Sequence, residues 1–318
     1  MRIGVLSNLR AGRDHSRVEK VLRELERHPD VLHLEANSSE LVPDALDQFA
    51  NEGVELLVVN GGDGTVQHAL TEILSSPRRS WLPLIAPIRG GRTNMVALDL
   101  GARRNPARAL RELIVDARAG RVAERIVQRE VLRVDLGPEL PIQYGMFFGV
   151  GMLYRAIHAT HRAFPEGKAQ GVFGAGIVTG TLVTRAATGD RAGILDADKM
   201  QIALDETPLA PDGFILAMAT TLERLFLRMR PFWGVEPAPI RITTIAAGAR
   251  LRASTVAGIL RGRPPSHATP EAGFTSRNVH KVALRLDCGT TLDGELFGPE
   301  SGRLVTLSSA DRVRFVRA

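Results

Sequence analysis

Hydrophobic positions recur along the first 120 residues in two alternating patterns, one typical of buried strands and one typical of amphipathic helices. The clearest strand pattern covers residues 54–60, which are almost continuously apolar and rich in β-branched side chains. After a glycine-rich turn, apolar residues return with helical spacing at Val66, Ala69, Leu70, Ile73 and Leu74. Repeated alternation of this kind predicts a doubly wound parallel sheet that binds its ligands at the carboxyl ends of the strands.

The pattern changes beyond about residue 122, where short apolar stretches are separated by turns that contain glycine or proline. Strands are expected at residues 131–136, 143–150, 200–204, 214–220, 240–246, 281–286 and 303–308. The chain is therefore predicted to be of the α/β class. An N-terminal nucleotide-binding domain covers residues 1–121, with residues 303–318 as a candidate completion of it. A β-rich, sandwich-like domain covers residues 122–302, in which residues 171–189 suggest a glycine-interrupted helix and residues 262–276 an exposed loop.

Composition excludes several other classes of protein. The 318 residues are 44% hydrophobic and 24% charged, which is ordinary for a globular chain with a sizeable core. The only cysteine is Cys288, so no intramolecular disulfide can form. The net charge is +6, but both signs are interspersed and only 5% of residues are aromatic, so nucleic-acid binding is not expected. No apolar run is long enough to span a bilayer. A cytoplasmic protein is expected, either free or peripheral to the inner face of the membrane.

The candidate chemistry is concentrated in the turn that follows the strand at residues 54–60. Gly61, Gly62, Asp63, Gly64 and Thr65 stand between this strand and the following helix. Glycines at such a junction let backbone N–H groups approach an anion, and the start of the helix adds partial positive charge. A carboxylate beside phosphate requires a cation between them. Asp63 therefore indicates a nucleoside triphosphate with Mg²⁺, and hence phosphoryl transfer.

Further polar loops follow other strands of the predicted domains. Asn8 and Ser39 come after the first and second strands, and another glycine-rich turn with Gly91, Arg92, Thr93 and Asn94 comes after the fourth. Far downstream, Asp293 and Glu295 lie on either side of Gly294. On a strand these two carboxylates would share one face, whereas the glycine alternatively makes a turn.

This ordered set of motifs resembles the diacylglycerol kinase-like lipid kinases, a group that includes bacterial lipid kinases and sphingosine kinases. Residues 61–65 carry the family's Gly-Gly-Asp-Gly-Thr loop unchanged. Residues 8–12, 91–94 and 293–295 resemble its Asn-Pro-x-Ser/Ala-Gly, Gly-Thr/Ser-x-Asn and Asp-Gly-Glu motifs. The resemblance implies transfer of the ATP γ-phosphate to a lipid hydroxyl at a membrane surface, with Mg²⁺. It implies Asp293 as general base, with Glu295 as the alternative, and the glycines as the phosphate cradle.

The chain departs from the family at three positions of these motifs. Leu9 replaces a proline, Arg92 replaces a threonine or serine, and Met95 replaces an aspartate. The acidic-Gly-x-Leu segment that helps many bacterial members to bind magnesium has only residues 234–237 as a counterpart. Arg92 is expected to meet phosphate directly, or Thr93 to supply the missing hydroxyl.

Two alternatives to a lipid kinase are considered. A soluble-metabolite kinase of the NAD-kinase type shares the Gly-Gly-Asp-Gly loop, but its usual Asn-Asn-Glu motif is absent from this sequence. A nucleotide-binding regulatory protein without catalysis would be consistent with Arg92 and Met95. The stretch at residues 222–233, which mixes apolar and cationic side chains, suggests either a membrane contact or an ordinary core-facing element.

Overall fold

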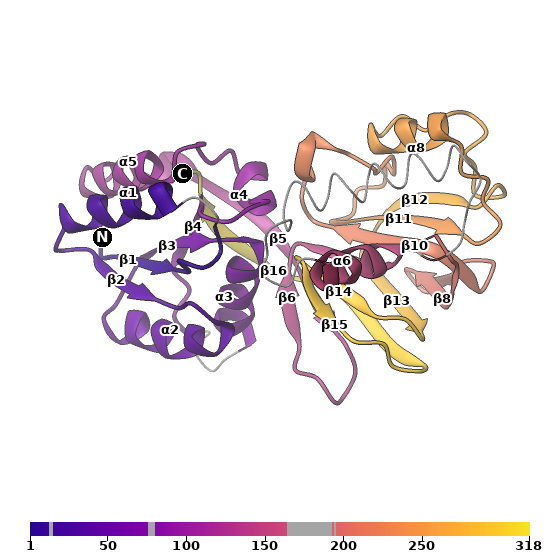
Figure 1. Ribbon diagram of the computed structural model, residues 1–318, viewed down its shortest axis with the longest axis horizontal. Helices are drawn as coiled ribbons and strands as arrows, with labels where there is room; N and C mark the ends of the chain where they lie inside the picture. The colour runs from indigo at the N-terminus through magenta and orange to yellow at the C-terminus, as the bar shows by residue number, and fades with distance from the viewer. Residues whose placement is uncertain (13–14, 76–79, 164–192, 194) are drawn as a thin grey trace. The chain divides into compact units, whose positions relative to one another are not determined.

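The computed structural model describes residues 1–12, 15–75, 80–163, 193 and 195–318. These residues form two compact units, one from residues 1–131 with 311–318 and the other from residues 132–310 (Figure 1). The predicted helix at residues 171–189 lies outside the described residues. Among the described residues, no helix is long and apolar enough to cross a membrane.

The first unit is built on a parallel sheet in which β2, β1, β3 and β4 are neighbours in that order, and the end of β16 pairs in parallel with β4. Its elements are β1 (Ile3–Ser7), α1 (His15–Glu26), β2 (Leu32–Glu35), η1 (Ser39–Leu41), α2 (Val42–Asn51), β3 (Leu56–Gly61), α3 (Asp63–Ser75), β4 (Leu84–Arg89), α4 (Met95–Asp99), α5 (Pro106–Arg118) and η3 (Val122–Arg125).

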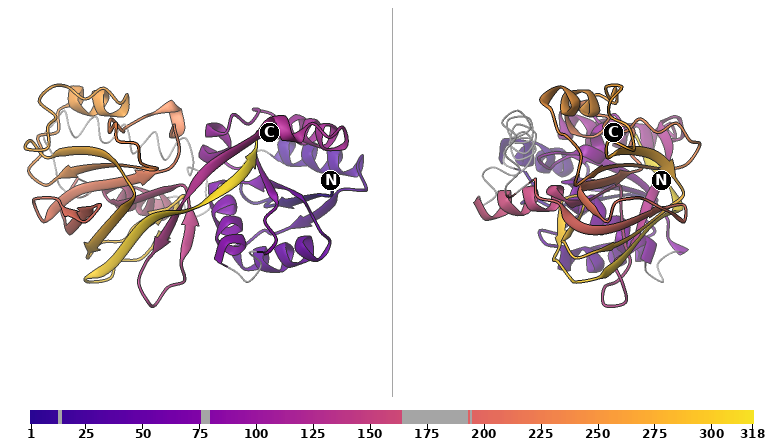
Figure 2. Two further views of the ribbon diagram at one scale, coloured as in Figure 1. Left: turned by 180° about the vertical axis from the view of Figure 1, so that it is seen from behind. Right: turned by 90° about the vertical axis from the view of Figure 1, so that its right-hand side faces the viewer.

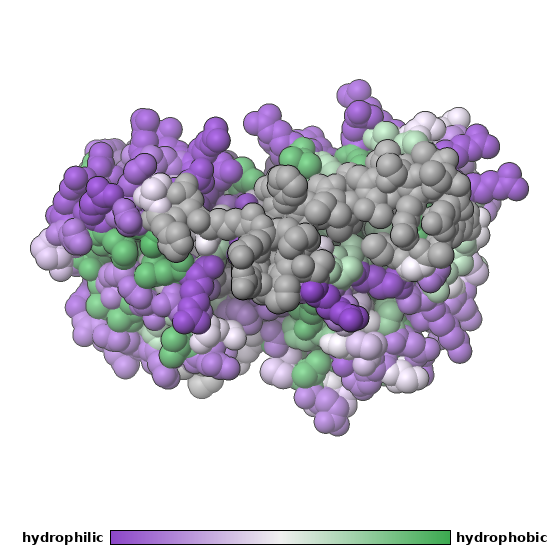
Figure 3. All heavy atoms as spheres, viewed as in Figure 1, coloured by the Kyte–Doolittle hydropathy of each residue, from purple (hydrophilic) through white to green (hydrophobic). Residues whose placement is uncertain are grey.

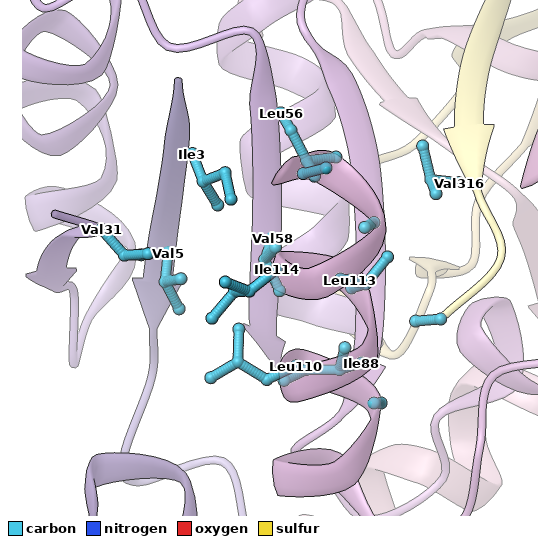
Figure 4. Close-up of a cluster of buried hydrophobic side chains, with 14 of the residues drawn as sticks. Ile3, Val5, Val31, Leu56, Val58, Ile88, Leu110, Leu113, Ile114 and Val316 are labelled. Atoms are coloured by element: carbon cyan, nitrogen blue, oxygen red, sulfur yellow. The ribbon is translucent and has the colours of Figure 1, made fainter. Parts of the chain in front are cut away.

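Every residue of β1 and β3 is buried, as expected for parallel strands covered on both faces. Figure 4 shows α5 packed on one face of this sheet, where Leu110, Leu113 and Ile114 meet Val58 and Ile88 from the strands. The helix α1 contributes Val21 and Leu25 to the same core. The predicted parallel sheet of this part is confirmed, and its carboxyl-end loops contain the polar motifs singled out above.

The second unit is antiparallel and β-rich, which confirms the predicted fold class. Its elements are β5 (Ile126–Asp135), β6 (Gln143–Gly145), β7 (Phe147–Gly151), α6 (Met152–Ala163), β8 (Asp198–Leu204), β9 (Thr207–Pro208), β10 (Gly213–Thr220), η4 (Phe226–Arg228), β11 (Ile240–Ala246), α8 (Ala253–Leu260), β12 (Phe274–Val279), β13 (Lys281–Leu286), β14 (Thr290–Leu292), β15 (Glu295–Phe297) and β16 (Arg303–Val316).

Two hydrophobic clusters fill this unit. The larger contains alternate residues of two groups of strands, one with β8, β13 and β16 and the other with β7, β10 and β11. The smaller contains residues of β10, β11, α6 and α8. The long curved strand β16 is clearest in Figure 2, and its first six residues pair with β13.

Several elements of the second unit were not predicted, among them the helices α6 and α8 and the strand β12. The helix α6 begins directly after β7, and α8 follows β11 after residues 247–252. Hydrophobic spacing in such short segments does not separate helix from strand. The strand β12 begins at Phe274, within the stretch at residues 262–276 that was predicted to be a loop. Its polar residues take part in the sheet because β11 supplies a full antiparallel partner from Ile240 to Ile245.

Candidate functional site

Three loops of the first unit meet at the carboxyl ends of β1, β3 and β4, and glycines make that approach possible. A Cβ atom on Gly91 would overlap the Cα atom of Gly62, and one on Gly90 would overlap the side-chain oxygen of Asn60. A Cβ atom on Gly12 would lie 2.8 Å from the carbonyl oxygen of Gly90. The predicted loops at residues 8–12, 61–65 and 90–94 therefore converge, as the parallel topology requires.

Asn8 joins the first loop to the start of α3. Its side-chain amide donates to Thr65 Oγ1 at 3.3 Å, and its side-chain oxygen accepts from the backbone N–H of Arg10 at 3.0 Å. The backbone N–H of Asn8 donates to the carbonyl of Asn60 at 2.9 Å. Thr65 is buried, and a Cβ atom on Gly61 would lie 2.6 Å from its side chain. Asn8 and Thr65 thus position the two loops relative to each other.

A buried polar network below these loops was not predicted from the sequence. Asn60 donates to Ser7 Oγ at 3.2 Å, and the same hydroxyl lies 3.0 Å from Nε2 of His33. Burial lowers the pKa of His33, while the Glu35 charge opposes this effect. The three residues lie on three adjacent strands, so only the pairing of these strands brings them together.

Asp63 joins the loop at residues 61–65 to the short helix α4. Its Oδ1 accepts from the backbone N–H of Val96 at 3.0 Å. Burial raises the pKa of Asp63, and backbone N–H groups at the start of α4 partly offset this rise. The carboxylate therefore holds the loop at residues 90–94 against the loop at residues 61–65. Carboxylate oxygens have further lone pairs, so a role for Asp63 toward Mg²⁺ stays a prediction.

The loop at residues 90–94 is also closed by its own side chains. Asn94 has a left-handed backbone with φ of 51°, its Oδ1 accepts from the Gly91 N–H at 2.8 Å, and its amide donates to the Gly91 carbonyl at 2.7 Å. Arg92 and Thr93 are half-buried on this loop. The local fold is thus set before any ligand arrives.

Ser39 occupies a different position from the three loops that converge. It is exposed at the start of η1, and its neighbour Ser38 makes no side-chain cap. The contact from this segment to the first loop comes instead from Asn37, whose Oδ1 accepts from the Leu9 N–H at 2.8 Å. Asn37 was missed because a single asparagine after a strand gives no signal beyond ordinary turn chemistry.

Asp293 lies in the second unit, in the two-residue turn of the β14–β15 hairpin. Asp293 and Gly294 both have positive φ, of 48° and 97°, so the turn interpretation of this motif is correct and the continuous strand is not. Asp293 is only 7% exposed. Its Oδ2 accepts from the N–H of Met146 at 2.8 Å and its Oδ1 from that of Phe147 at 3.0 Å.

Residues around Asp293 fix its position further. Thr220 Oγ1 donates to the Met146 carbonyl at 2.6 Å, and a Cβ atom on Gly145 would lie 2.5 Å from Asp293 Oδ2. Each oxygen of the carboxylate accepts one backbone N–H here, and an ionised carboxylate oxygen can accept two hydrogen bonds. Glu295 is half-buried and opens β15, where it pairs with Leu292. Both remain candidates for the general base.

The predicted counterpart of the magnesium-binding segment, residues 234–237, makes structural contacts in the second unit. Glu236, in the segment at residues 234–237, accepts from Arg277 Nε at 3.0 Å and from the Asn278 N–H at 2.9 Å, and these contacts lower its pKa. Glu236 therefore anchors its loop to β12. No group of three or more possible metal-ligating side chains is found within the described residues.

The stretch at residues 222–233 divides into a packed part and an exposed part. Phe232 and Trp233 pack against the smaller hydrophobic cluster of the unit, as a core-facing element would. Leu227 is 62% exposed, and both Leu227 and Arg228 have positive φ, of 54° and 58°. Leu227 is the one large apolar side chain that is exposed in this stretch, all of which the structure describes, and a membrane contact stays a prediction.

Comparison with known proteins agrees with an α/β unit followed by an antiparallel unit. Residues 2–136 match the family model described as the diacylglycerol kinase catalytic domain. The match covers less than half of the chain, and these residues are similar to the catalytic domain of diacylglycerol kinases. No curated protein matches the sequence.

Solved structures similar to this chain extend over nearly its whole length. One is named a “putative diacylglycerol kinase” from Bacillus anthracis strain Sterne, with 18% identity, a TM-score of 0.70, and coverage of 99% of this chain and 97% of that one. Another is a diacylglycerol kinase from the same strain, with 17% identity, a TM-score of 0.62, and coverage of 99% and 96%. At such identities the likeness establishes the shared fold of both units.

Proposed function

We propose that this protein transfers the γ-phosphate of ATP to the hydroxyl group of a lipid alcohol. The observation that carries the proposal is the convergence of the two glycine loops, in which a Cβ atom on Gly91 would lie only 2.2 Å from the Cα atom of Gly62. Backbone N–H groups at such a junction, next to the start of α3, suit a phosphate chain.

Within the first unit, Gly61, Gly62 and Gly64 would cradle the phosphates through their backbone N–H groups, with Gly91 and Arg92 on the opposing loop. Asn8 and Thr65 would orient the loops, since they already bind each other. Thr93, Asn94 and Ser39 would be secondary nucleotide contacts. Mg²⁺, with Asp63 as its candidate ligand, would neutralise charge on the transferred group when bound.

In the second unit, Asp293 is assigned as the general base. The lipid oxygen would attack the γ-phosphorus, the bond to the bridging oxygen would break, ADP would leave, and Asp293 would accept the hydroxyl proton. A base must be held in place, and the two backbone N–H bonds from Met146 and Phe147 hold this carboxylate. Glu295 is the alternative base. The lipid would be reached by transient docking on a membrane surface, on its cytoplasmic side.

The test is transfer from labelled ATP with Mg²⁺ to diacylglycerol, sphingoid bases and other lipid alcohols in mixed micelles. We expect a labelled lipid with the unmodified protein and a loss of about 10²–10⁴-fold with Asp293→Asn, the range for a positioned acid–base group. Asp205→Asn is the matched control, because Asp205 also accepts two backbone N–H bonds in a hairpin turn.

Each contrary outcome has a distinct meaning. Full turnover by Asp293→Asn would reject Asp293 as the base, and Glu295→Gln would then test the alternative. Transfer to NAD or another soluble alcohol, without labelled lipid, would indicate a soluble-metabolite kinase. ATP binding without transfer to any acceptor would indicate a regulatory protein, the possibility raised by Arg92 and Met95.

A further inference from the structure

Arg89 is a partly buried cation next to the glycine loops that the assignments above leave without a role. It is the last residue of β4 and pairs in register with Gly61 of β3. The backbone turns sharply there, since the Gly90 N–H donates to the Ile88 carbonyl at 2.8 Å. The Nε atom of Arg89 is buried, and within the described part of the chain it has no hydrogen-bond partner. A buried guanidinium N–H without an acceptor is costly.

The surroundings of Arg89 are cationic. Burial is the main cause that lowers the pKa of Arg89, and the charges of Arg17 in α1 and Arg104 before α5 lower it further. Like charges close to a partly buried cation destabilise the folded protein unless an anion lies among them.

Arginines close to Arg104 in the sequence, in and before α5, have carboxylate partners. Arg103 and Arg108 pair with Glu112, and Arg111 pairs with Glu24 through two bonds of 2.8 and 2.6 Å. For Arg104, no ion pair is found with any residue that the structure describes. Hydrophilic side chains cover α1 and α5 in Figure 3, but most of this charge is balanced locally. Arg89 likewise has no carboxylate partner within the described residues.

We propose that Arg89, assisted by Arg104 and Arg17, binds the phosphate chain of the nucleotide. This inference rests on the proposed function, because it places the phosphates beside the same glycine loops. Arginine suits the role, since its planar fork binds two phosphate oxygens at once and stays charged. The cluster would favour nucleotides in the order of their charge, with ATP above ADP and ADP above AMP.

This proposal predicts two opposite effects of a single substitution. In Arg89→Gln, removal of a crowded cation should raise the melting temperature of the ligand-free protein by about 1–3 °C. The same variant should bind ATP about 10-fold more weakly, because the charged hydrogen bonds from the guanidinium to the phosphate oxygens are lost. A purely structural arginine would give a lower melting temperature and unchanged binding.

The experiment combines calorimetric titration with thermal unfolding, using ATP, ADP, AMP and inorganic tripolyphosphate as probes. We expect Arg89→Gln to weaken ATP and tripolyphosphate by a similar factor and AMP least. Arg89→Lys, which keeps the charge but not the fork, should lie between. Arg104→Gln should weaken ATP several-fold and reduce the dependence of binding on salt. Arg103→Gln is the matched control, because Arg103 is adjacent but paired with Glu112.

The outcomes separate this inference from the proposed function. Equal ATP affinity in Arg89→Gln and the unmodified protein, or no binding of any probe to the unmodified protein, overturns the inference. Because binding needs no lipid, a protein that phosphorylates no lipid but loses ATP affinity with Arg89→Gln supports the inference and rejects lipid phosphorylation. If the protein phosphorylates a lipid and Arg89→Gln binds ATP as tightly as the unmodified protein, lipid phosphorylation is supported and the role of Arg89 is rejected.

Discussion

Two hairpin turns of the second unit are built in nearly the same way, although only one of them contains a proposed catalytic residue. Asp205–Glu206 joins β8 to β9, and Asp293–Gly294 joins β14 to β15; all four residues have positive φ. Each aspartate accepts two consecutive backbone N–H groups, one from the residue before a neighbouring strand and one from the first residue of that strand. A carboxylate that holds a strand in this way is therefore a structural device first, and it is not by itself a sign of catalysis.

The two turns differ in burial and in how the carboxylate is used. Asp205 is exposed, and its Oδ1 alone accepts from His280 and Lys281 at 2.9 and 2.8 Å. Asp293 is buried and uses a different oxygen for each N–H. Asp293 is therefore held in one orientation by both of its oxygens, whereas Asp205 is held through one oxygen.

The largest effect on stability is expected from Gly145→Ala. The new methyl group would meet Asp293 Oδ2 at 2.5 Å and Leu292 Cδ1 at 2.7 Å, and both atoms are fixed, so we expect about 2–3 kcal/mol of destabilisation. Urea unfolding followed by circular dichroism measures this change. Gly298→Ala, with open space around its Cβ position, is the control. Unchanged stability in Gly145→Ala would mean that Asp293 can move.

A smaller effect separates the two aspartates directly. In Asp293→Asn, the amide nitrogen must face one of the two N–H groups, so we expect a loss of about 1–3 kcal/mol. In Asp205→Asn, the remaining oxygen can accept both N–H groups, and the expected change is within about 0.5 kcal/mol. Thermal unfolding of the two variants side by side gives the result. Equal losses would show that the division between two oxygens has no energetic consequence.

The second residue of each turn should respond with opposite signs. Gly294 has φ of 97°, so Gly294→Ala should destabilise the protein by about 1 kcal/mol. Glu206 has φ of 70°, a region costly for a residue with a Cβ atom, so Glu206→Gly should stabilise by up to about 1 kcal/mol. Chemical denaturation midpoints provide the comparison. A loss in Glu206→Gly would mean that its side chain makes a favourable contact.

The smallest effect concerns the first unit, where a histidine rather than a carboxylate connects the strands. Since burial lowers the pKa of His33 below its usual value of 6.5, the unfolded chain binds the proton more readily. The contribution of neutral His33 to the free energy of unfolding should be fully present above about pH 6.5. The free energy of unfolding should then fall by about 1 kcal/mol or less as the pH drops toward the pKa of His33 in the folded protein. His33→Gln should remove this part of the pH dependence of the melting temperature. If the melting temperature of His33→Gln depends on pH in the same way as that of the unmodified protein, the lowered pKa of His33 does not contribute to stability.

The fold and the loops that bear the motifs could be predicted from the sequence, because they depend on local patterns. Buried parallel strands give continuous apolar runs, and the glycine loops stand where such runs end. The parallel sheet and the antiparallel unit were accordingly expected, while α6, α8 and the start of β12 were not. The apolar spacing in α6 and α8 is compatible with either a helix or a strand. The residues of β12 form a strand because they pair with β11.

The chemical environment of the side chains was decided only by the tertiary structure. The sequence by itself determined that Gly61, Gly62 and Gly91 stand at strand ends, and that Asp293 precedes a glycine. It could not show that Gly91 touches Gly62, that Asn60, Ser7 and His33 form one network, or that Arg89 lies near Arg17 and Arg104. Hydrophobic patterns record which face of an element is buried, whereas hydrogen bonds and charge balance depend on residues distant in the chain that the folded strands bring together.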